Sequence, residues 1–315
     1  MANLLTSPWP ELKYEAWQET CATLQLWTQV VGKIRLMQTP WLNHSWHVPL
    51  YVNSKGLTTS PIPHGSRSFE IGFDFIEQVL DITVSDGGTR RLALRPQSVA
   101  DFYAAVMSAL TALGVAVSIN ERPCEIANAT AFSEDRVHVA YDPEYAWRFW
   151  QVLQQADRVL KQFRTAFLGK SSPVHFFWGS FDLAVTRFSG RRAPPFAGKA
   201  LGVASKIMRE AYSHEVSSAG FWPGGNGTDY PAFYSYAYPM SAGFRKRPVQ
   251  PPAAFFGEAL GEFLLPYEAV RTAADPEAAL LTFLQSTYEA AADSADWDRA
   301  ALECPRGRSG VCRDP

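Results

Sequence analysis

Four histidines and one glutamate are the residues of this chain best suited to chemistry. His44 and His47 lie three positions apart, His175 lies in the second half, and His214 is followed at once by Glu215. Imidazole and carboxylate groups are the usual ligands of zinc, iron, manganese and nickel. The four histidines therefore offer a ligand set for a divalent metal ion. Beside such a metal, Glu215 is placed to act as a general base toward a bound water or substrate.

The spacing of these histidines leaves a structural alternative open. On an extended chain, residues three apart point to opposite faces, so His44 and His47 converge only if a turn brings them together. Otherwise the histidines bond backbone groups at strand ends among aromatic neighbours. The distances among their side-chain nitrogens distinguish the two interpretations, since metal–ligand bonds are only about 2 Å long.

A second set of residues is a candidate for binding a ligand without metal. Asp182 and Arg187 share the run FDLAVTRF, where a buried charge is unfavourable by several kcal/mol unless it is paired. They are therefore expected to be paired or to face a ligand, and the alternative is that they lie on the solvated face of a sheet. Trp178 and Trp222 add rings on which a planar or sugar-like group can stack, and Trp222 precedes a glycine-rich stretch that can close on a ligand. The alternative for such rings is ordinary packing in a strand.

Two stretches that resemble each other predict an internal duplication. Residues 17–63 and 145–191 each read as a helix followed by short β-rich runs, and a gapless overlay sets His47 on His175. Paired positions of a duplicated fold can meet near its pseudo-twofold axis. The overlay sets His44 on Ser172, however, so a site that uses these histidines is asymmetric.

Each half is predicted to contain one helix, about five antiparallel strands and a second helix. Phe69, Ile71 and Phe73 alternate with polar or small residues, as in a half-buried strand. Ser98 and Asp275 are typical N-caps for the second helix of each half.

This order of elements indicates an α+β fold in which the helices pack on one face of antiparallel sheet. It is similar to the duplicated saddle of TATA-binding-protein-like folds, a likeness of architecture alone. The predicted units are an N-terminal repeat at 1–114, a linker at 115–144, a C-terminal repeat at 145–303 with insertions at 191–208 and 221–230, and a disordered tail at 304–315.

Composition excludes several classes of function. A formal net charge of −2 argues against nucleic-acid binding, which needs an excess of lysine and arginine on one face. The sequence shows neither a secretory signal nor an apolar run long enough to span a bilayer, so no membrane association is expected. The four cysteines have no metal-type spacing and favour a reducing, cytoplasmic setting. The expected partner is a small molecule.

Several longer blocks carry a family resemblance. They are His47-Val-Pro-Leu-Tyr-Val, His175-Phe-Phe-Trp-Gly-Ser-Phe-Asp-Leu and Ser213-His-Glu-Val-Ser-Ser-Ala-Gly-Phe-Trp-Pro-Gly. In these blocks the chain resembles a bacterial family known only as a domain of unknown function. The resemblance implies a bacterial, stand-alone, cytoplasmic protein and assigns no catalytic residue.

Two hypotheses for function follow. The first is a small-molecule enzyme or binding protein with a His/Glu site between the two halves, with a divalent metal ion as a candidate cofactor. The second is a non-catalytic module that binds a ligand or a protein through an aromatic-rich sheet face.

Overall fold

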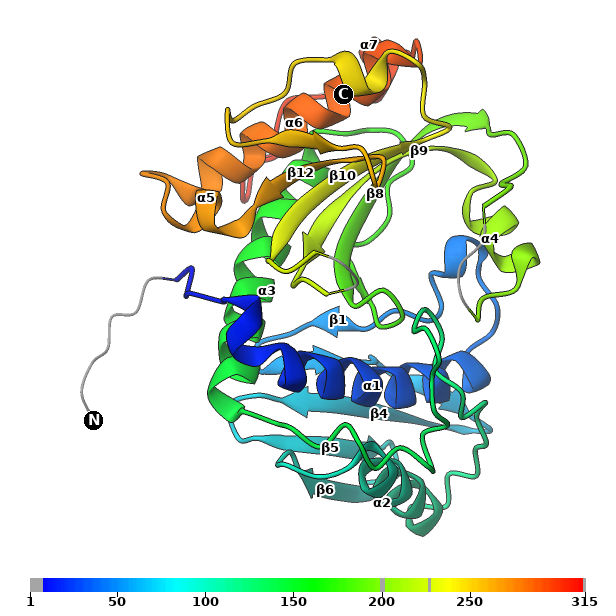
Figure 1. Cartoon of the computed structure of the whole chain (residues 1–315). Coiled ribbons are helices and arrows are strands. Elements are labelled where there is room, and N and C mark those ends of the chain that lie inside the picture. Colours follow the sequence, from blue (N-terminus) through cyan, green and yellow to red (C-terminus); the bar gives the residue numbers. More distant parts are fainter. Residues whose placement is uncertain (1–7, 199–201, 226–227, 314–315) are drawn as a thin grey trace.

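The fold was analysed in a computed structural model that describes residues 8–198, 202–225 and 228–313 (Figure 1). Within these residues the chain forms helices and two antiparallel sheets of six strands each, which is an α+β arrangement. One sheet comes from each half of the chain. No helix in this part of the chain has the length and apolar character that crossing a membrane requires.

The N-terminal sheet has the strand order β1-β2-β4-β5-β6, and β3 pairs with β4. On β4, Phe69, Ile71 and Phe73 are buried, whereas Glu70 and Gly72 between them are half-buried, as the alternation predicted. The elements of this half are α1 (Tyr14–Gln38), the short helix η1 (Asn43–Ser45), β1 (Tyr51–Val52), β2 (Gly56–Thr58), β3 (Ile62–His64), β4 (Arg67–Asp74), β5 (Val79–Val84), β6 (Thr89–Ala93) and α2 (Val99–Ala112).

The C-terminal sheet has the strand order β11-β12-β10-β9-β8-β7. Its longest strand, β8, is buried along most of its length, so this sheet is covered on both faces. The elements of this half are α3 (Pro143–Thr165), β7 (His175–Phe177), β8 (Asp182–Arg192), α4 (Ser205–Ala211), β9 (His214–Trp222), β10 (Ala232–Tyr238), η2 (Phe244–Lys246), β11 (Phe255–Gly257), β12 (Glu262–Pro266), α5 (Tyr267–Arg271), α6 (Pro276–Ser294) and α7 (Arg299–Leu302).

Polar caps begin the helices that follow the sheets. The Ser98 side chain accepts a hydrogen bond from the backbone of Asp101, and Asp275 accepts one from the backbone of Ala278. Both caps were predicted from the sequence. The sequence did not predict β11 or α4, and α4 begins inside the predicted insertion at 191–208 and ends three residues beyond it.

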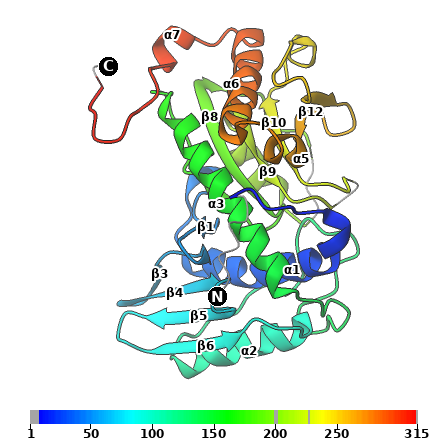
Figure 2. The same ribbon diagram turned by 90° about the vertical axis from the view of Figure 1, so that its left-hand side faces the viewer.

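Helix α3 connects the two halves. It packs against α6 and β8 on the C-terminal side and against α1 and β1 on the N-terminal side (Figure 2). Aromatic rings fill the core around it: Trp17 of α1 lies 5.1 Å from Phe149 of α3, measured between ring centroids. A single apolar core therefore continues from one half into the other.

The seam between the sheets is made by backbone. Leu50 and Phe176 exchange two hydrogen bonds, of 2.8 and 2.7 Å. Beside them, Trp178 Nε1 donates to the carbonyl of Val48 at 2.9 Å. A Cβ atom on Gly32 would lie 2.2 Å from the Trp178 indole, so a glycine in α1 is needed for this ring to pack against the helix.

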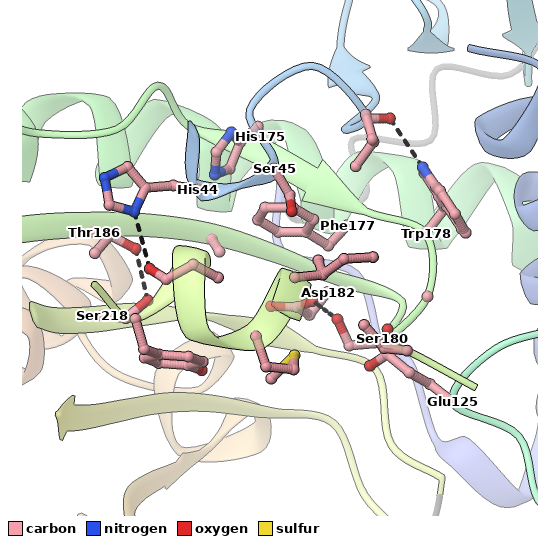
Figure 3. Close-up of a pocket in the computed structure, with 18 of the residues that line it drawn as sticks. His44, Ser45, Glu125, His175, Phe177, Trp178, Ser180, Asp182, Thr186 and Ser218 are labelled. Atoms are coloured by element: carbon pink, nitrogen blue, oxygen red, sulfur yellow. Dashed lines mark hydrogen bonds between the residues drawn. The ribbon is translucent and has the colours of Figure 1, made fainter. Parts of the chain in front are cut away.

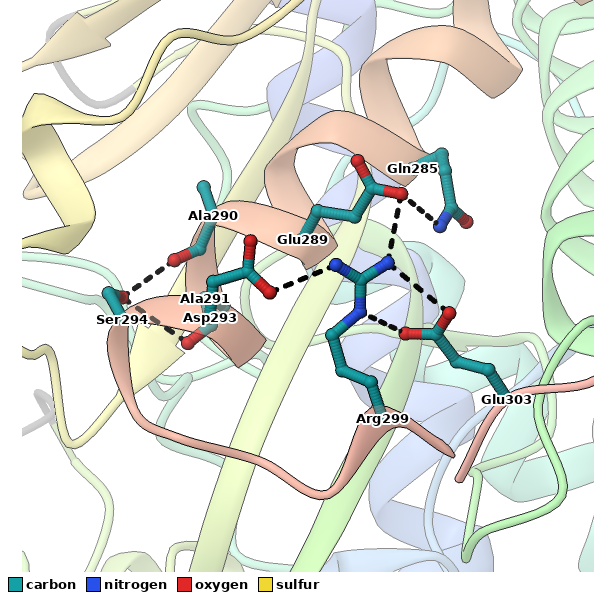
Figure 4. A network of polar contacts seen from close by, with 8 residues as sticks. All are labelled: Gln285, Glu289, Ala290, Ala291, Asp293, Ser294, Arg299 and Glu303. Carbon is teal, nitrogen blue, oxygen red and sulfur yellow. Dashed lines mark hydrogen bonds and ion pairs between the residues drawn. The ribbon is translucent and has the colours of Figure 1, made fainter. Parts of the chain in front are cut away.

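Ion pairs connect α7 to α6. Arg299 of α7 bonds Glu289 at 3.1 Å, Asp293 at 2.9 Å and Glu303 at 2.5 Å (Figure 4). The sequence predicted a disordered tail from residue 304; its described part returns to the end of α3, where the Gly307 backbone donates to Thr165 Oγ1 at 3.0 Å.

Candidate functional site

A cavity of about 560 Å³ lies between the C-terminal sheet and segments of the N-terminal half. One wall is the face of β7–β10 and β12 that points away from α3 and α6. The rest of the lining comes from α1, the segment around η1, residues 124–125 and α4. A volume of this size lies within the range typical of small-molecule sites. The cavity is therefore the best candidate site in the described part of the chain.

Strand alternation on β8 decides which residues reach this cavity. Asp182, Ala184 and Thr186 line it, whereas Leu183 and Val185 between them are buried in the apolar core. Successive side chains of a strand point to opposite faces, so β8 supplies the cavity with every second residue.

Three carboxyl groups form an acidic pole in the cavity: Glu125, Asp182 and Glu262. Figure 3 shows Glu125 and Asp182 on either side of Ser180. Asp182, only 8% exposed, accepts hydrogen bonds from the hydroxyl of Ser180 at 2.5 Å and from that of Tyr234. Within the described residues, neither Glu125 nor Glu262 has a hydrogen bond or an ion pair.

Burial changes the protonation of this pole. It raises the pKa of Glu125 to about 7 and the pKa of Glu262 to about 7, and in both cases the negative charge of Asp182 adds to the effect. Burial also raises the pKa of Asp182, against the opposing hydrogen bonds from Ser180 and Tyr234. Glu125 and Glu262 therefore titrate near neutral pH.

Two glycines make room for the pole. A Cβ atom on Gly179 would lie 2.2 Å from Oε1 of Glu125. A Cβ atom on Gly220 would lie 2.1 Å from the carbonyl oxygen of Leu183 and 2.6 Å from the hydroxyl of Tyr234. Any larger residue at these positions displaces the carboxyl or the tyrosine that bonds Asp182.

Tyrosines of β10 stand beside the acidic pole. Tyr234 and Tyr236 lie with their rings nearly parallel, at a centroid distance of 6.1 Å and an interplanar angle of 16°. The hydroxyl of Tyr236 pairs with that of Tyr212 at 3.0 Å. Burial raises the pKa of all three phenols, so they remain neutral hydrogen-bonding groups.

A second region of the cavity is polar and presents the imidazole of His44 and two hydroxyl groups. His44 Nδ1 lies 2.9 Å from the carbonyl of Ala211 and its Nε2 lies 2.7 Å from Lys170 Nζ. The ammonium donates to Nε2, which makes Nδ1–H the donor to Ala211, and burial lowers the pKa of His44. Thr186 and Ser218 share a hydroxyl hydrogen bond of 2.9 Å near His44 (Figure 3).

The predicted metal ligands do not converge on one point, although the rings of His44 and His214 lie 6.1 Å apart between centroids. His44 and His175 line the cavity, whereas His47 and His214 do not. His47 Nδ1 lies 3.2 Å from both the backbone N and O of Leu42, and His214 Nδ1 lies 3.1 Å from the hydroxyl of Ser213. Burial lowers the pKa of His175 to about 3. The described residues contain no group of three or more His, Cys, Asp or Glu placed to hold a metal ion.

The remaining candidates fall inside and outside the cavity. Trp178, Asp182 and Trp222 line it. Glu215, the predicted base, does not: it pairs with Arg191 at 2.8 Å and accepts a hydrogen bond from Ser189 at 2.9 Å.

Arg187 points to the opposite face of the sheet. Its guanidinium lies 3.5 Å from the Phe163 ring centroid and 4.4 Å from that of Tyr288, and it donates to the carbonyl of Phe163. Its Nε and Nη1 have no hydrogen-bond partner among the residues that the structure describes. The rings and one carbonyl stabilise this buried charge, which lies away from the cavity.

Sequence reasoning missed Glu125, Glu262 and the β10 tyrosines as site residues. The tyrosines had a readable signal, because alternation in the run AFYSYAY places Tyr234 and Tyr236 on one face. Glu125 had none: it lies in a segment without helix or strand and has a φ of 58°, in the left-handed region.

Residues 9–304 match the family described as a family of unknown function, DUF5996. The chain belongs to this family. The match covers both halves and every residue of the acidic pole, so the cavity lies wholly within the family's extent. No curated protein and no solved structure matches the chain.

Proposed function

We propose that this DUF5996 protein binds a small organic molecule in the cavity between its two halves and exchanges a proton with it through the acidic pole. The proposal keeps the sequence-based hypothesis of a small-molecule enzyme or binding protein. The proposed acid–base groups are Glu125 and Glu262 in place of Glu215.

The observation that carries this proposal is a pair of carboxyls on the cavity wall that have no hydrogen bond within the described residues. A largely desolvated carboxyl without hydrogen bonds is unfavourable for folding, so its presence calls for a role other than stability. With a pKa of about 7, Glu125 and Glu262 are each partly protonated at neutral pH. Such a group can either donate or accept a proton, which suits general acid–base catalysis.

A cavity-filling variant tests the location of the site. Ala184 is 4% exposed and lines the cavity, so Ala184→Phe places a ring in it. In a panel of small organic molecules, compounds that raise the Tm of the wild-type protein should not raise that of Ala184→Phe. Equal stabilisation of both proteins would place binding elsewhere.

Proton exchange is tested on the compounds that bind. Calorimetric titration in two buffers of different ionisation enthalpy measures protons taken up or released on binding. We expect a net proton change near pH 7 that disappears in the double variant Glu125→Gln/Glu262→Gln. Binding with no proton change in either protein would contradict the proposed role of the pole.

A non-catalytic binding module is the second candidate. Trp41 is 51% exposed at the cavity lining, and its neighbours Met37 and Leu42 are 55% and 49% exposed. These three exposed apolar side chains lie within six residues of the sequence and are the candidate contact surface for such a module. Binding without turnover, combined with loss of a partner on Trp41→Ser, would favour this candidate.

We also propose that the two halves arose by duplication. In the overlay that sets His47 on His175, Leu50 corresponds to Trp178 and Phe176 corresponds to Val48. The structure contains a contact between Leu50 and Phe176, made by backbone, and one between Trp178 and Val48, made by the indole and a carbonyl. Any antiparallel pairing that sets Leu50 opposite Phe176 also sets Val48 opposite Trp178, so the support for duplication rests on the sequence overlay.

A further inference from the structure

The geometry points to an organic cation as the occupant of the cavity, with its charged nitrogen held at the acidic pole of Glu125, Asp182 and Glu262. This inference rests on the proposed binding site and specifies the chemistry of its ligand. It predicts a molecule with an ammonium group at one end and a neutral hydrogen-bonding group at the other.

Uncompensated negative charge is the first support. Among the described residues, no lysine, arginine or histidine forms an ion pair with Glu125, Asp182 or Glu262. The cavity-lining Lys33 is engaged elsewhere, since its Nζ donates to the carbonyl of Arg122 at 2.7 Å. A cationic ligand supplies the missing countercharge in a place where solvent screening is weak.

Aromatic surface is the second support. Tyr234 and Tyr236 present parallel rings, and the indoles of Trp178 and Trp222 belong to the same lining. The negative face of an aromatic ring attracts a cation, and sites for ammonium ligands combine such rings with carboxylates. An anionic ligand would meet repulsion from the pole, and Lys33, the lysine of the described lining, already donates to a backbone carbonyl.

The region around His44, Thr186 and Ser218 is expected to bind the other end of the ligand. Thr186 and Ser218 bring two hydroxyls together, each able to donate or accept a hydrogen bond. His44 faces the same region and is held neutral by burial. The apolar Phe177 and Ala184 line the cavity with these polar groups, so we expect an apolar spacer in the ligand.

A divalent metal ion is the competing cation. Metal ions require several ligand atoms at one point, at roughly 2.0–2.6 Å. The described residues contain no group of three or more His, Cys, Asp or Glu with that placement. The three carboxyls instead border a shared volume, which suits a larger, diffuse cation.

Three compounds of similar shape and different charge test the inference. Phenethylamine, phenethyl alcohol and hydrocinnamate are titrated calorimetrically into the full-length protein. We expect the amine to bind about tenfold or more tightly than the alcohol, and the carboxylate to bind most weakly.

Isosteric variants locate the effect at the pole. Asp182→Asn and, as a second variant in case the first fails to fold, Glu262→Gln should each weaken amine binding about fivefold or more while leaving alcohol binding unchanged. Glu77→Gln, an exposed carboxyl after β4, is the matched control and should change neither.

The outcomes separate this inference from the proposed site. Equal binding of amine and alcohol, both lost in Ala184→Phe, would overturn the cationic ligand and leave the site intact. If Ala184→Phe still binds the amine and the alcohol, both the cationic ligand and the proposed site are overturned. Preference for the carboxylate, binding of none of the three compounds, or displacement of the amine by magnesium, manganese or zinc chloride would overturn the inference.

Discussion

Outward-facing residues of the N-terminal sheet lie in solvent, whereas the corresponding face of the C-terminal sheet is enclosed. In the first sheet, Asp81 of β5 pairs with Arg91 of β6 at 2.7 Å, and the arginine side chain is 57% exposed. In the second, Asp182 of β8 is 8% exposed and shares a cavity with two other carboxyls. Two sheets of equal strand number thus place acidic groups in opposite environments.

The difference shows how covering the second face of a sheet changes the behaviour of its carboxylates. A surface ion pair is worth about 0–1 kcal/mol and is screened by salt. The same carboxylate inside a cavity interacts strongly with any charge that enters, because few waters compete. By covering the second face of the C-terminal sheet, the N-terminal half converts ordinary strand residues into a site. Function is therefore expected to depend on contacts between the halves.

Two glycines on central strands are expected to give the largest difference in stability between the sheets when each is replaced by alanine. Gly220 of β9 has no room for a side chain, since a Cβ atom would lie 2.1 Å from the Leu183 carbonyl. Gly72 of β4 has its nearest neighbour, the Leu57 carbonyl, at 3.8 Å from a Cβ. We expect Gly220→Ala to lower the free energy of unfolding by about 3 kcal/mol, through overpacking. Gly72→Ala should raise it by about 0.5 kcal/mol, because alanine restricts the unfolded chain.

Urea denaturation of the two variants measures both changes. The two substitutions are chemically identical, so similar effects would show that the enclosed face is no more tightly packed than the exposed one.

The sequence predicted the elements better than the site. Strong local signals, such as the Ser98 and Asp275 caps and the alternation on β4, identify helices and strands because their physics is local. The site brings Glu125, Asp182 and Glu262 together from segments far apart in the chain. No local pattern encodes that convergence, and Glu125 follows no period at all.

Histidine was a misleading guide for a related reason. Its side chain serves equally as a metal ligand and as a neutral hydrogen-bonding group. In this protein His44 bonds Ala211 and Lys170, and His47 bonds the backbone of Leu42. The seam between the sheets lies at Leu50 and Phe176, three residues after His47 and one residue after His175. Neither histidine therefore makes that backbone contact itself.

Two arginines extend the comparison to the opposite charge. Arg187 is 1% exposed and packs against Phe163 and Tyr288, whereas Arg91 is exposed and pairs with Asp81. Arg187→Ala removes the packing and leaves a void, so we expect it to lower the free energy of unfolding by about 2 kcal/mol. Arg91→Ala should lower it by less than about 1 kcal/mol.

Salt separates the two arginine effects. High salt should abolish the effect of Arg91→Ala and leave that of Arg187→Ala, because a buried charge is poorly screened. A loss at Arg187 that disappears in salt would show that this residue acts through exposed charge.

The pH dependence of stability gives the smallest effect and the most specific one. The pKa of Glu125 is about 7 in the folded protein, above its ordinary value of 4.5. Between these two values the unfolded chain loses the proton while the folded protein keeps it. The contribution of Glu125 to the free energy of unfolding is therefore fully present below pH 4.5 and is lost as the pH rises through about 7. Glu125→Gln cannot ionise and should escape this loss.

We expect Glu125→Gln to match the wild-type free energy of unfolding near pH 4 and to exceed it by about 1 to 2 kcal/mol near pH 8, less than the full shift implies because the carboxyl borders a cavity open to water. Urea denaturation across this range measures the difference, with the exposed Glu77→Gln as the control that should show none. A stabilisation already present near pH 4 would mean that glutamine improves packing and that charge is not the cause. If the variant is more stable than the wild type only at high pH, the ionised form of Glu125 lowers the stability of the folded protein. Retention of such a carboxylate is what the proposed ligand-binding role predicts.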